Sequence, residues 1–250
     1  MRMTVLGSGS AGNGYLLEGA TSALVIECGV KPEELFRRTS IAPSKIAGCL
    51  VSHEHGDHAA YAGRYASLGL HIYASEGTIR GIKGIVPEYQ ASVLRAMHVQ
   101  YIGEWKVSPF DVRHDAAEPL GFIIEHPEAG RILFVTDTRM VPYTFRSLNL
   151  DHIMVEANYD DRIMDGRVES GEVDQAQAAR VRGTHMSLGA ACDLIRANQT
   201  ANLKTVTLIH LSSGNADARR FREIATKAAL FAKIEVASAG LVVEMNKREI

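Results

Sequence analysis

Three histidines and one aspartate occur within residues 53–58, His-Glu-His-Gly-Asp-His, directly after the apolar run 47–51. Imidazole nitrogen and carboxylate oxygen are ligands that zinc, manganese and iron accept in proteins. A tight turn after a buried strand, eased by Gly56, can direct His53 and His55 toward one ion, and Asp57 and His58 toward another. Two ions roughly 3.5–4 Å apart can stabilise both oxygens of a displacement at phosphorus. The motif therefore predicts a dinuclear metallohydrolase.

Composition favours an ordinary soluble chain. Of 250 residues, 46% are hydrophobic and 22% are charged, which is close to a globular average, and we expect one domain over residues 1–250. The formal net charge of -2 gives no global basic field to attract nucleic acid. The three cysteines, Cys28, Cys49 and Cys192, are far apart and odd in number, as in a reducing compartment. With no signal-like start and no run of 18 apolar residues, the sequence predicts a cytoplasmic protein without a membrane partner.

Apolar runs bounded by glycine-rich turns alternate with amphipathic stretches along the whole chain. The predicted strands are residues 4–7, 14–18, 22–28, 46–52, 70–74, 99–101, 104–110, 120–125, 131–136, 152–156, 204–210, 233–236 and 241–244. The predicted helices are residues 32–38, 58–68, 142–148, 173–181, 187–198 and 217–231. This alternation favours two packed sheets with helices outside and ligands on loops at one edge.

Further ligand-type side chains end three of the apolar runs. His114 follows the run 107–112, Asp137 follows 132–136 and His210 follows 206–209. Sheet-based sites gather their functional groups at such strand ends, and the two oxygens of Asp137 suit a bridge between cations. Each residue also has an ordinary interpretation, because a strand-end aspartate often caps a turn and a strand-end histidine often only forms hydrogen bonds.

Several sequence blocks resemble the metallo-β-lactamase superfamily, and more narrowly its WalJ/YycJ-type bacterial nucleases, over nearly the whole chain. The blocks are Leu-Gly-Ser-Gly-Ser-Ala-Gly-Asn-Gly at 6–14, residues 51–58, His-Asp-Ala-Ala-Glu-Pro at 114–119, Thr-Asp-Thr at 136–138, Glu-Ala-Asn at 156–158, His-Met-Ser at 185–187 and His-Leu-Ser at 210–212. The resemblance implies an α/β fold, the metallo-β-lactamase-like αββα four-layer sandwich. One departure is Tyr159, where the family tends to carry a histidine.

The resemblance also implies which residues hold the two divalent ions, Zn²⁺ or Mn²⁺, with iron as a further choice. By position, one ion is held by His53, His55 and His114, the other by Asp57, His58 and His210, and Asp137 bridges them. Bound ions lower the pKa of a shared water, so that hydroxide can attack phosphorus near neutral pH. The implied activity is that of a phosphodiesterase on nucleic acid, a 5′-to-3′ exonuclease on single-stranded DNA or duplex ends.

Residues outside the ligand set have weaker assignments. Asp57 can orient the hydroxide, and His185 can contact the phosphate or protonate the leaving group, although it can instead simply cap the helix that follows. Ser8 and Asn13, in the glycine-rich turn, are candidate phosphate contacts through nearby backbone amides. Asn158 is a further candidate substrate contact. Glu156 and Asn158 end another predicted strand, so they can also form a second layer around the ligands or an ordinary turn.

Other functions remain compatible with this sequence. The same dinuclear site can act on a small cyclic phosphodiester or a thioester. A non-catalytic binding module of this fold would have lost ligands, whereas the set here is complete. A di-iron oxidoreductase would need a flavin partner, and no flavin-binding segment is evident in the sequence. The native metal, DNA against RNA, exonuclease against endonuclease cleavage, and monomer against dimer stay open at this point.

Overall fold

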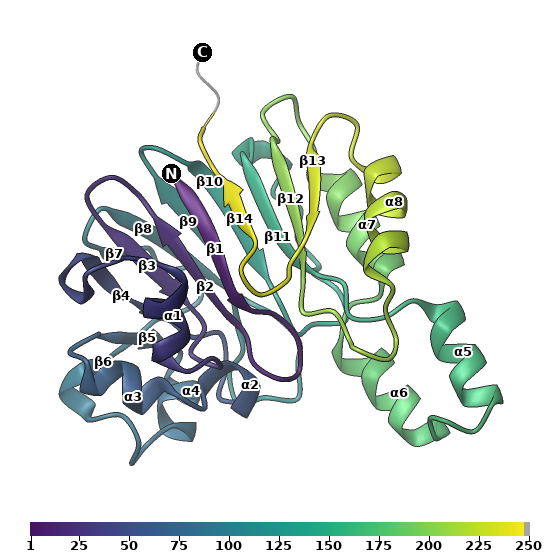
Figure 1. Cartoon of the computed structure of the whole chain (residues 1–250), viewed down its shortest axis with the longest axis horizontal. Coiled ribbons are helices and arrows are strands. Elements are labelled where there is room, and N and C mark those ends of the chain that lie inside the picture. Colours follow the sequence, from purple (N-terminus) through teal and green to yellow (C-terminus); the bar gives the residue numbers. More distant parts are fainter. Residues whose placement is uncertain (248–250) are drawn as a thin grey trace.

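Two seven-stranded sheets pack face to face in the computed structural model of the chain, which describes residues 1–247. Helices α1 to α4 lie beside the first sheet and α7 and α8 beside the second, while α5 and α6 project from one side (Figure 1). This arrangement confirms the predicted four-layer α/β sandwich. Within residues 1–247, no helix has the length and apolar character needed to cross a bilayer.

The strands follow the predicted order closely. The first sheet runs β14-β1-β2-β3-β4-β5-β6, and the second runs β13-β12-β11-β10-β9-β8-β7. In the first sheet the bounds are β14 Val242–Glu244, β1 Arg2–Gly7, β2 Gly14–Glu18, β3 Ala23–Ile26, β4 Ile46–Leu50, β5 Ile72–Ala74 and β6 Ala91–Val93. In the second they are β13 Lys233–Val236, β12 Thr205–Ile209, β11 His152–Glu156, β10 Gly130–Val135, β9 Leu120–His126, β8 Trp105–Asp111 and β7 Gln100–Ile102.

Eight α-helices connect these strands within the described residues. They are α1 Pro32–Arg38, α2 Gly56–Ala59, α3 Ala62–Ser67, α4 Glu76–Gly81, α5 Asp161–Glu169, α6 Gln175–Thr184, α7 Leu188–Asn198 and α8 Ala218–Ala228. Short 3₁₀ turns occur at Pro43–Lys45, Glu88–Gln90 and Arg146–Leu148. In each sheet, one half is antiparallel and the other half, β3 to β6 or β10 to β13, is parallel.

The central parallel strands are mainly apolar because both of their faces are buried. In β3, Leu24 packs in the cluster between the two sheets, and its neighbour Val25 packs in the cluster under the outer helices. In β12, Ile209 faces the layer between the sheets and Leu208 faces the helices. Successive side chains of a strand point to opposite faces, so one apolar run supplies two core layers.

One predicted helix is wrong. Residues 142–148 were expected to be helical, but only Arg146–Leu148 forms a 3₁₀ turn. The backbone N–H of Phe145 donates to the Asn198 side-chain oxygen, and the Phe145 ring packs against Phe110 at a centroid distance of 4.9 Å. These tertiary contacts hold the segment in an irregular path, so they outweigh its local propensity.

The predicted helix 58–68 is interrupted. The carbonyl of His58 accepts from the backbone N–H of Cys28, and the N–H of Tyr61 donates to the Cys28 carbonyl. These hydrogen bonds to Cys28, a residue distant in the sequence, replace helical hydrogen bonds and divide the segment into α2 and α3. Helices α4 and α5 and strand β6 were not predicted. Asp160 caps α5, because its side chain accepts from the backbone N–H groups of Arg162 and Ile163.

We predict that His152 makes folding stability sensitive to acid. It is fully buried in β11, and burial lowers its pKa to about 4, whereas its ordinary value is 6.5. The unfolded chain therefore binds a proton between these pH values that the folded chain does not bind. Lowering the pH from 7 to 4.5 should cost on the order of 2 kcal/mol through this residue.

The measurement is urea unfolding of the wild type and of His152→Gln across this pH range. The variant has a different absolute stability, so the comparison is of the two slopes with pH. The free energy of unfolding of the variant should fall less steeply on acidification. Parallel pH profiles for the two proteins would contradict the prediction.

Candidate metal centre

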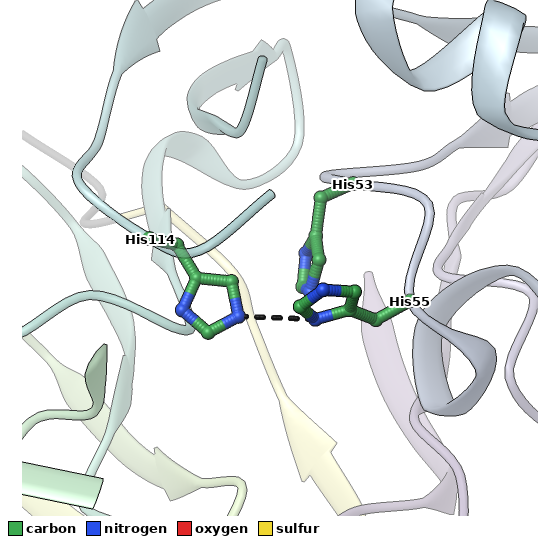
Figure 2. Close-up of side chains that lie close together, drawn as sticks. All are labelled: His53, His55 and His114. Carbon is green, nitrogen blue, oxygen red and sulfur yellow. Dashed lines mark hydrogen bonds between the residues drawn. The ribbon is translucent and has the colours of Figure 1, made fainter. Parts of the chain in front are cut away.

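Three imidazoles converge at the first group of predicted ligands. His53 and His55 lie in the turn between β4 and α2, and His114 lies between β8 and β9. Their ring centroids are 4.7 to 4.9 Å apart, and Nε2 of His114 lies 3.1 Å from Nδ1 of His55. Figure 2 shows the three rings turned toward one another. One nitrogen from each ring lies within 4.8 Å of the other two, a spacing that one ion can fill.

In two of these rings, His53 and His114, the opposite nitrogen is held by the protein. Nδ1 of His53 is 2.9 Å from the Ser52 hydroxyl, and Nδ1 of His114 is 3.1 Å from the carbonyl oxygen of Thr184. Nε2 of His53 is buried without a hydrogen-bond partner among the described residues. Burial lowers the pKa of both His53 and His114, which favours neutral rings with a free lone pair. A buried nitrogen of this kind fits a metal ion.

A second group lies beside the first. Oδ2 of Asp57 is 3.1 Å from Nε2 of His210 and 3.4 Å from Nε2 of His58. Burial raises the pKa of the Asp57 carboxyl, but hydrogen bonds from His210 and His58 outweigh it and hold the pKa well below its usual range. Asp57 is therefore ionised at neutral pH. A carboxylate and two imidazoles within 4.8 Å of one another form a second donor set.

The carboxylate of Asp137 lies between the two groups. Its Oδ2 is 3.5 Å from Nε2 of His114 and 3.9 Å from Nε2 of His53. Its Oδ1 is 3.3 Å from Nε2 of His58 and 3.0 Å from Nδ1 of His210. Burial opposes the charge on Asp137, but His210 and His58 outweigh burial and lower its pKa strongly. Each oxygen of one charged carboxylate thus faces a different group of imidazoles.

The backbone is strained where two of these residues leave their strands. Asp137 has φ of 44° and His210 has φ of 54°, both in the left-handed region that non-glycine residues rarely occupy. Such conformations cost about 1–3 kcal/mol and cluster at functional sites. The backbone N–H of His210 donates to the Ser8 hydroxyl at 2.8 Å, and its carbonyl accepts from Asn158 at 3.0 Å. Ser8 and Asn158 therefore fix the strained turn at His210.

Two buried glutamates contact Nδ1 of the two histidines of the second group. Oε1 of Glu156 is 2.9 Å from Nδ1 of His210 and 2.7 Å from Nδ1 of His185. Oε2 of Glu27 is 3.5 Å from Nδ1 of His58. Carboxylates in this position orient ligand histidines and raise their basicity. Sequence reasoning placed Glu156 behind the ligands but missed Glu27, whose only signal is an acid near the end of the apolar run 22–28.

The electrostatics of the second group suit a cation. Burial lowers the pKa of both His58 and His210, but the charge of Asp137 outweighs it, so both pKa values lie well above normal. The charge of Asp137 thus favours the protonated form of both rings. Metal binding to histidine requires the neutral ring, so a divalent ion would replace these protons as the neutralising charge. The donor chemistry therefore fits two divalent ions.

The remaining predicted residues lie around this centre. Oδ1 of Asn13 accepts from the backbone N–H of Gly9, and its Nδ2 is 3.2 Å from Nε2 of His58. Ser8 and Asn13 form hydrogen bonds within the protein. Their contact with a substrate phosphate stays a prediction. His185 is the C-cap residue of α6, and its ring centroid lies 5.5 Å from those of both His114 and His210. The structure thus places His185 beside both groups.

A pocket of about 260 Å³ gives access to the centre, and we call it the metal pocket. His55, Asp57, His114, Asp137, His185 and His210 line it, together with polar side chains that include Ser10, Asn158, Gln177 and Arg180. Arg180, in α6, forms an ion pair with Asp115, with its Nη2 2.9 Å from Oδ2 of the carboxylate. The lining is polar and carries both signs of charge, as a site for a charged substrate requires.

The fold and these donors define a protein class. A family model described as the beta-lactamase superfamily domain matches residues 24–211, and the chain belongs to this superfamily. Solved structures agree: the metallo-beta-lactamase fold protein YhfI of Bacillus subtilis has a TM-score of 0.76 at 18% identity, covering 97% of this chain and 98% of that chain. The short form of human tRNase Z has a TM-score of 0.68 at 17% identity, covering 98% and 99%.

Among curated proteins, the chain is similar to bacterial exodeoxyribonucleases. It is 30% identical over 169 residues to exodeoxyribonuclease YycJ of Bacillus anthracis, covering 64% of each protein. It is 28% identical over 174 residues to exodeoxyribonuclease WalJ of Streptococcus pneumoniae D39, covering 65% of this chain and 64% of the relative. The similarity thus spans slightly less than two thirds of these relatives. The predicted superfamily and the predicted likeness to WalJ/YycJ-type nucleases are confirmed.

We predict that the wild type binds about two divalent ions per chain, and that Asp137 supports both. Asp137→Asn removes the charge that faces both imidazole groups. It should weaken the binding of each ion by at least about tenfold. His55→Ala should remove about one ion, because His55 belongs to the first group alone. Metal content after dialysis, with titration of Zn²⁺ and Mn²⁺ into stripped protein, measures both effects. His98→Ala, an exposed histidine away from the centre, is the control; wild-type binding by Asp137→Asn would contradict the prediction.

Proposed function

We propose that the chain is a metal-dependent hydrolase, a phosphodiesterase that degrades nucleic acid as a 5′-to-3′ exodeoxyribonuclease on single-stranded DNA or duplex ends. The observation that carries this proposal is the division of the Asp137 oxygens between two imidazole groups, 3.0 to 3.9 Å from their nitrogens. Paired divalent ions are the arrangement that many phosphodiester-cleaving enzymes use. The names of the curated relatives support DNA as the substrate, and the family resemblance supports the 5′-to-3′ direction.

Asp57 is suited to orient the attacking water. When bound, divalent ions would supply positive charge to the phosphate oxygens and lower the pKa of a water molecule. Asp57 is ionised and lines the metal pocket, so its carboxylate can accept a hydrogen bond from that water. Hydrogen bonds from His58 and His210 restrict the orientation of the carboxylate.

His185 is suited to protonate the leaving oxygen. Burial lowers its pKa, but the hydrogen bond and charge of Glu156 outweigh burial, and the pKa is raised above its ordinary value. With Nδ1 held on Glu156, the protonated ring carries its second proton at Nε2, on a side chain that lines the metal pocket. A general acid of this kind contributes about 10²- to 10⁴-fold to a rate.

We predict that the metal-loaded chain releases 5′ mononucleotides from a doubly end-labelled single-stranded DNA. Asp57→Asn should lower the rate by about 10²-fold or more, because it loses the charge that orients the water. The assay compares stripped protein with protein given back Mn²⁺ or Zn²⁺. Absence of cleavage by protein with a confirmed two-ion content would overturn the DNA substrate and favour a small phosphodiester or thioester.

We further predict that His185→Ala slows DNA cleavage by about 10²- to 10⁴-fold but slows a p-nitrophenyl phosphodiester far less. The nitrophenolate anion is stable enough to leave without a proton. A deoxyribose oxygen must be protonated as it leaves. Steady-state kcat on both substrates gives the ratio. His71→Ala, which changes a partly buried histidine on the first sheet, is the control. Equal losses on the two substrates would show that His185 acts on the metal centre instead of on the leaving group.

A further inference from the structure

A second cavity lies beside the metal pocket and has no role in the chemistry described so far. Its volume is about 720 Å³, in the range of pockets that hold small organic ligands. It lies between the irregular segment that follows β10 and helices α6 and α7, and we call it the side cavity. Its lining includes Arg139, Tyr143, Tyr159, Arg182, Asp193 and Asn198.

The same segments of chain form the walls of both hollows. After β10, Asp137 lines the metal pocket and Arg139 lines the side cavity. After β11, Asn158 lines the metal pocket and Tyr159 lines the side cavity. Along the last turn of α6, Arg180 lines the first hollow and Arg182 lines the second. Because residues one or two positions apart line the two hollows in each segment, the side cavity and the metal pocket are neighbours.

The side cavity has one arginine in its lining without an acidic partner, Arg139. Asp193 pairs with Arg196 at 2.7 Å, and Asp161 and Asp165 both pair with Arg182. Each acid in the lining, Asp161 and Asp193, thus already has an arginine partner, although Arg182 is shared between two acids. Arg139 is exposed, and its guanidinium has no ion pair or hydrogen bond within residues 1–247. An anionic ligand in the side cavity would meet this free guanidinium, which binds phosphate in a planar, two-pronged manner.

An aromatic ring, Tyr143, lines the same cavity as Arg139. Tyr143 is 43% exposed, and its ring packs edge-on against Phe110 at a centroid distance of 6.1 Å, with Phe145 at 6.3 Å. The neighbouring Met140 is 53% exposed, so an apolar surface remains open at the mouth of the cavity. A ring supported from behind and open on the cavity side is suited to stack on a planar ligand such as a nucleobase.

We propose that the side cavity binds nucleotides of the single strand whose scissile phosphate lies in the metal pocket. Arg139 contacts a backbone phosphate, and Tyr143 stacks on an unpaired base. The proposal rests on the nucleic-acid function above and adds its strand specificity. A base must leave the duplex before it can stack on a side chain, so the side cavity selects single strands over paired ends.

The experiment measures affinity and its salt dependence. The probe is a fluorescent ten-nucleotide single-stranded DNA with phosphorothioate linkages, which keep the backbone charge and resist cleavage, bound to the metal-loaded full chain. Arg139→Gln should reduce the slope of log affinity against log salt by about 0.7, the value for one lost phosphate contact on a single strand. Tyr143→Ala should weaken binding at least about fivefold with the slope unchanged, and Tyr143→Trp should retain binding.

Matched variants control for surface effects. Arg2→Gln changes an exposed arginine at the start of β1, and Tyr89→Ala changes a tyrosine that is 81% exposed. Both should bind the probe as the wild type does, and thermal unfolding should show that every variant is folded. A blunt duplex of equal length should compete at least about tenfold more weakly than the single strand.

Two results would overturn the proposal: a wild-type salt slope for Arg139→Gln, or equal affinities for Tyr143→Ala and Tyr89→Ala. Hydrolysis of bis(p-nitrophenyl) phosphate by the wild type tests the phosphodiesterase function separately. Hydrolysis of this ester without binding of the strand would overturn the side cavity as a strand site and leave the phosphodiesterase standing. Binding with the expected slopes but no hydrolysis of any phosphodiester would support the side cavity and overturn the proposed catalysis.

Discussion

The charge of one buried carboxylate organises the centre of this protein. Asp137 is almost fully buried, and an ionised group there is stable only if compensating charges surround it. The protonated forms of His58 and His210 can supply that charge, and a nitrogen of each ring lies within 3.3 Å of Oδ1 of Asp137. The other oxygen faces His53 and His114, whose rings are neutral. The two faces of one side chain therefore differ in electrostatic state, which prepares two distinct sites for cations.

The centre exists only because the two sheets pack together. Glu27 directly follows β3 of the first sheet, and His58 lies in α2 after β4. Glu156 ends β11 of the second sheet, and His210 directly follows β12. Each sheet thus contributes a buried carboxylate paired with an imidazole. Asp137 and His210 adopt strained backbone where they leave their strands, and the surrounding packing maintains that strain. Loss of the packing between the sheets would separate the two halves of the donor set.

The structure brings together the residues that the sequence predicts as ligands, because their positions follow from local rules. His53 to His58 are close in the chain, and Asp137 and His210 end long apolar runs whose parallel strands must finish at one edge. Glu27 could not be predicted in the same way. A single acid after an apolar run resembles a turn residue, and its role depends on His58, which is 31 positions away and reaches Glu27 only after the strand and turn have folded. The residues next to Glu27 in the sequence do not indicate this distant partner.

The errors have a similar physical origin. Residues 142–148 carry a helical pattern, yet Phe145 bonds to Asn198, which is 53 positions further along the chain. The same irregular segment forms one wall of the side cavity, whose other walls come from α6 and α7. No period in the sequence marks that cavity, because it results from three segments that meet only in the tertiary structure. The misassigned helix and the unforeseen cavity are therefore one feature of the fold.

The overall charge of the chain constrains how it can hold a polyanion. A net charge of -2 excludes a broad electrostatic field, and arginines beside the centre are already engaged, Arg180 with Asp115 and Arg182 with Asp161. On the proposed function, attraction to the strand must come from the metal ions, from free groups such as Arg139, and from stacking. Few phosphate contacts make binding weakly dependent on salt. The strand is then selected by the shape of its unpaired bases more than by its charge, which agrees with an enzyme that acts on single strands.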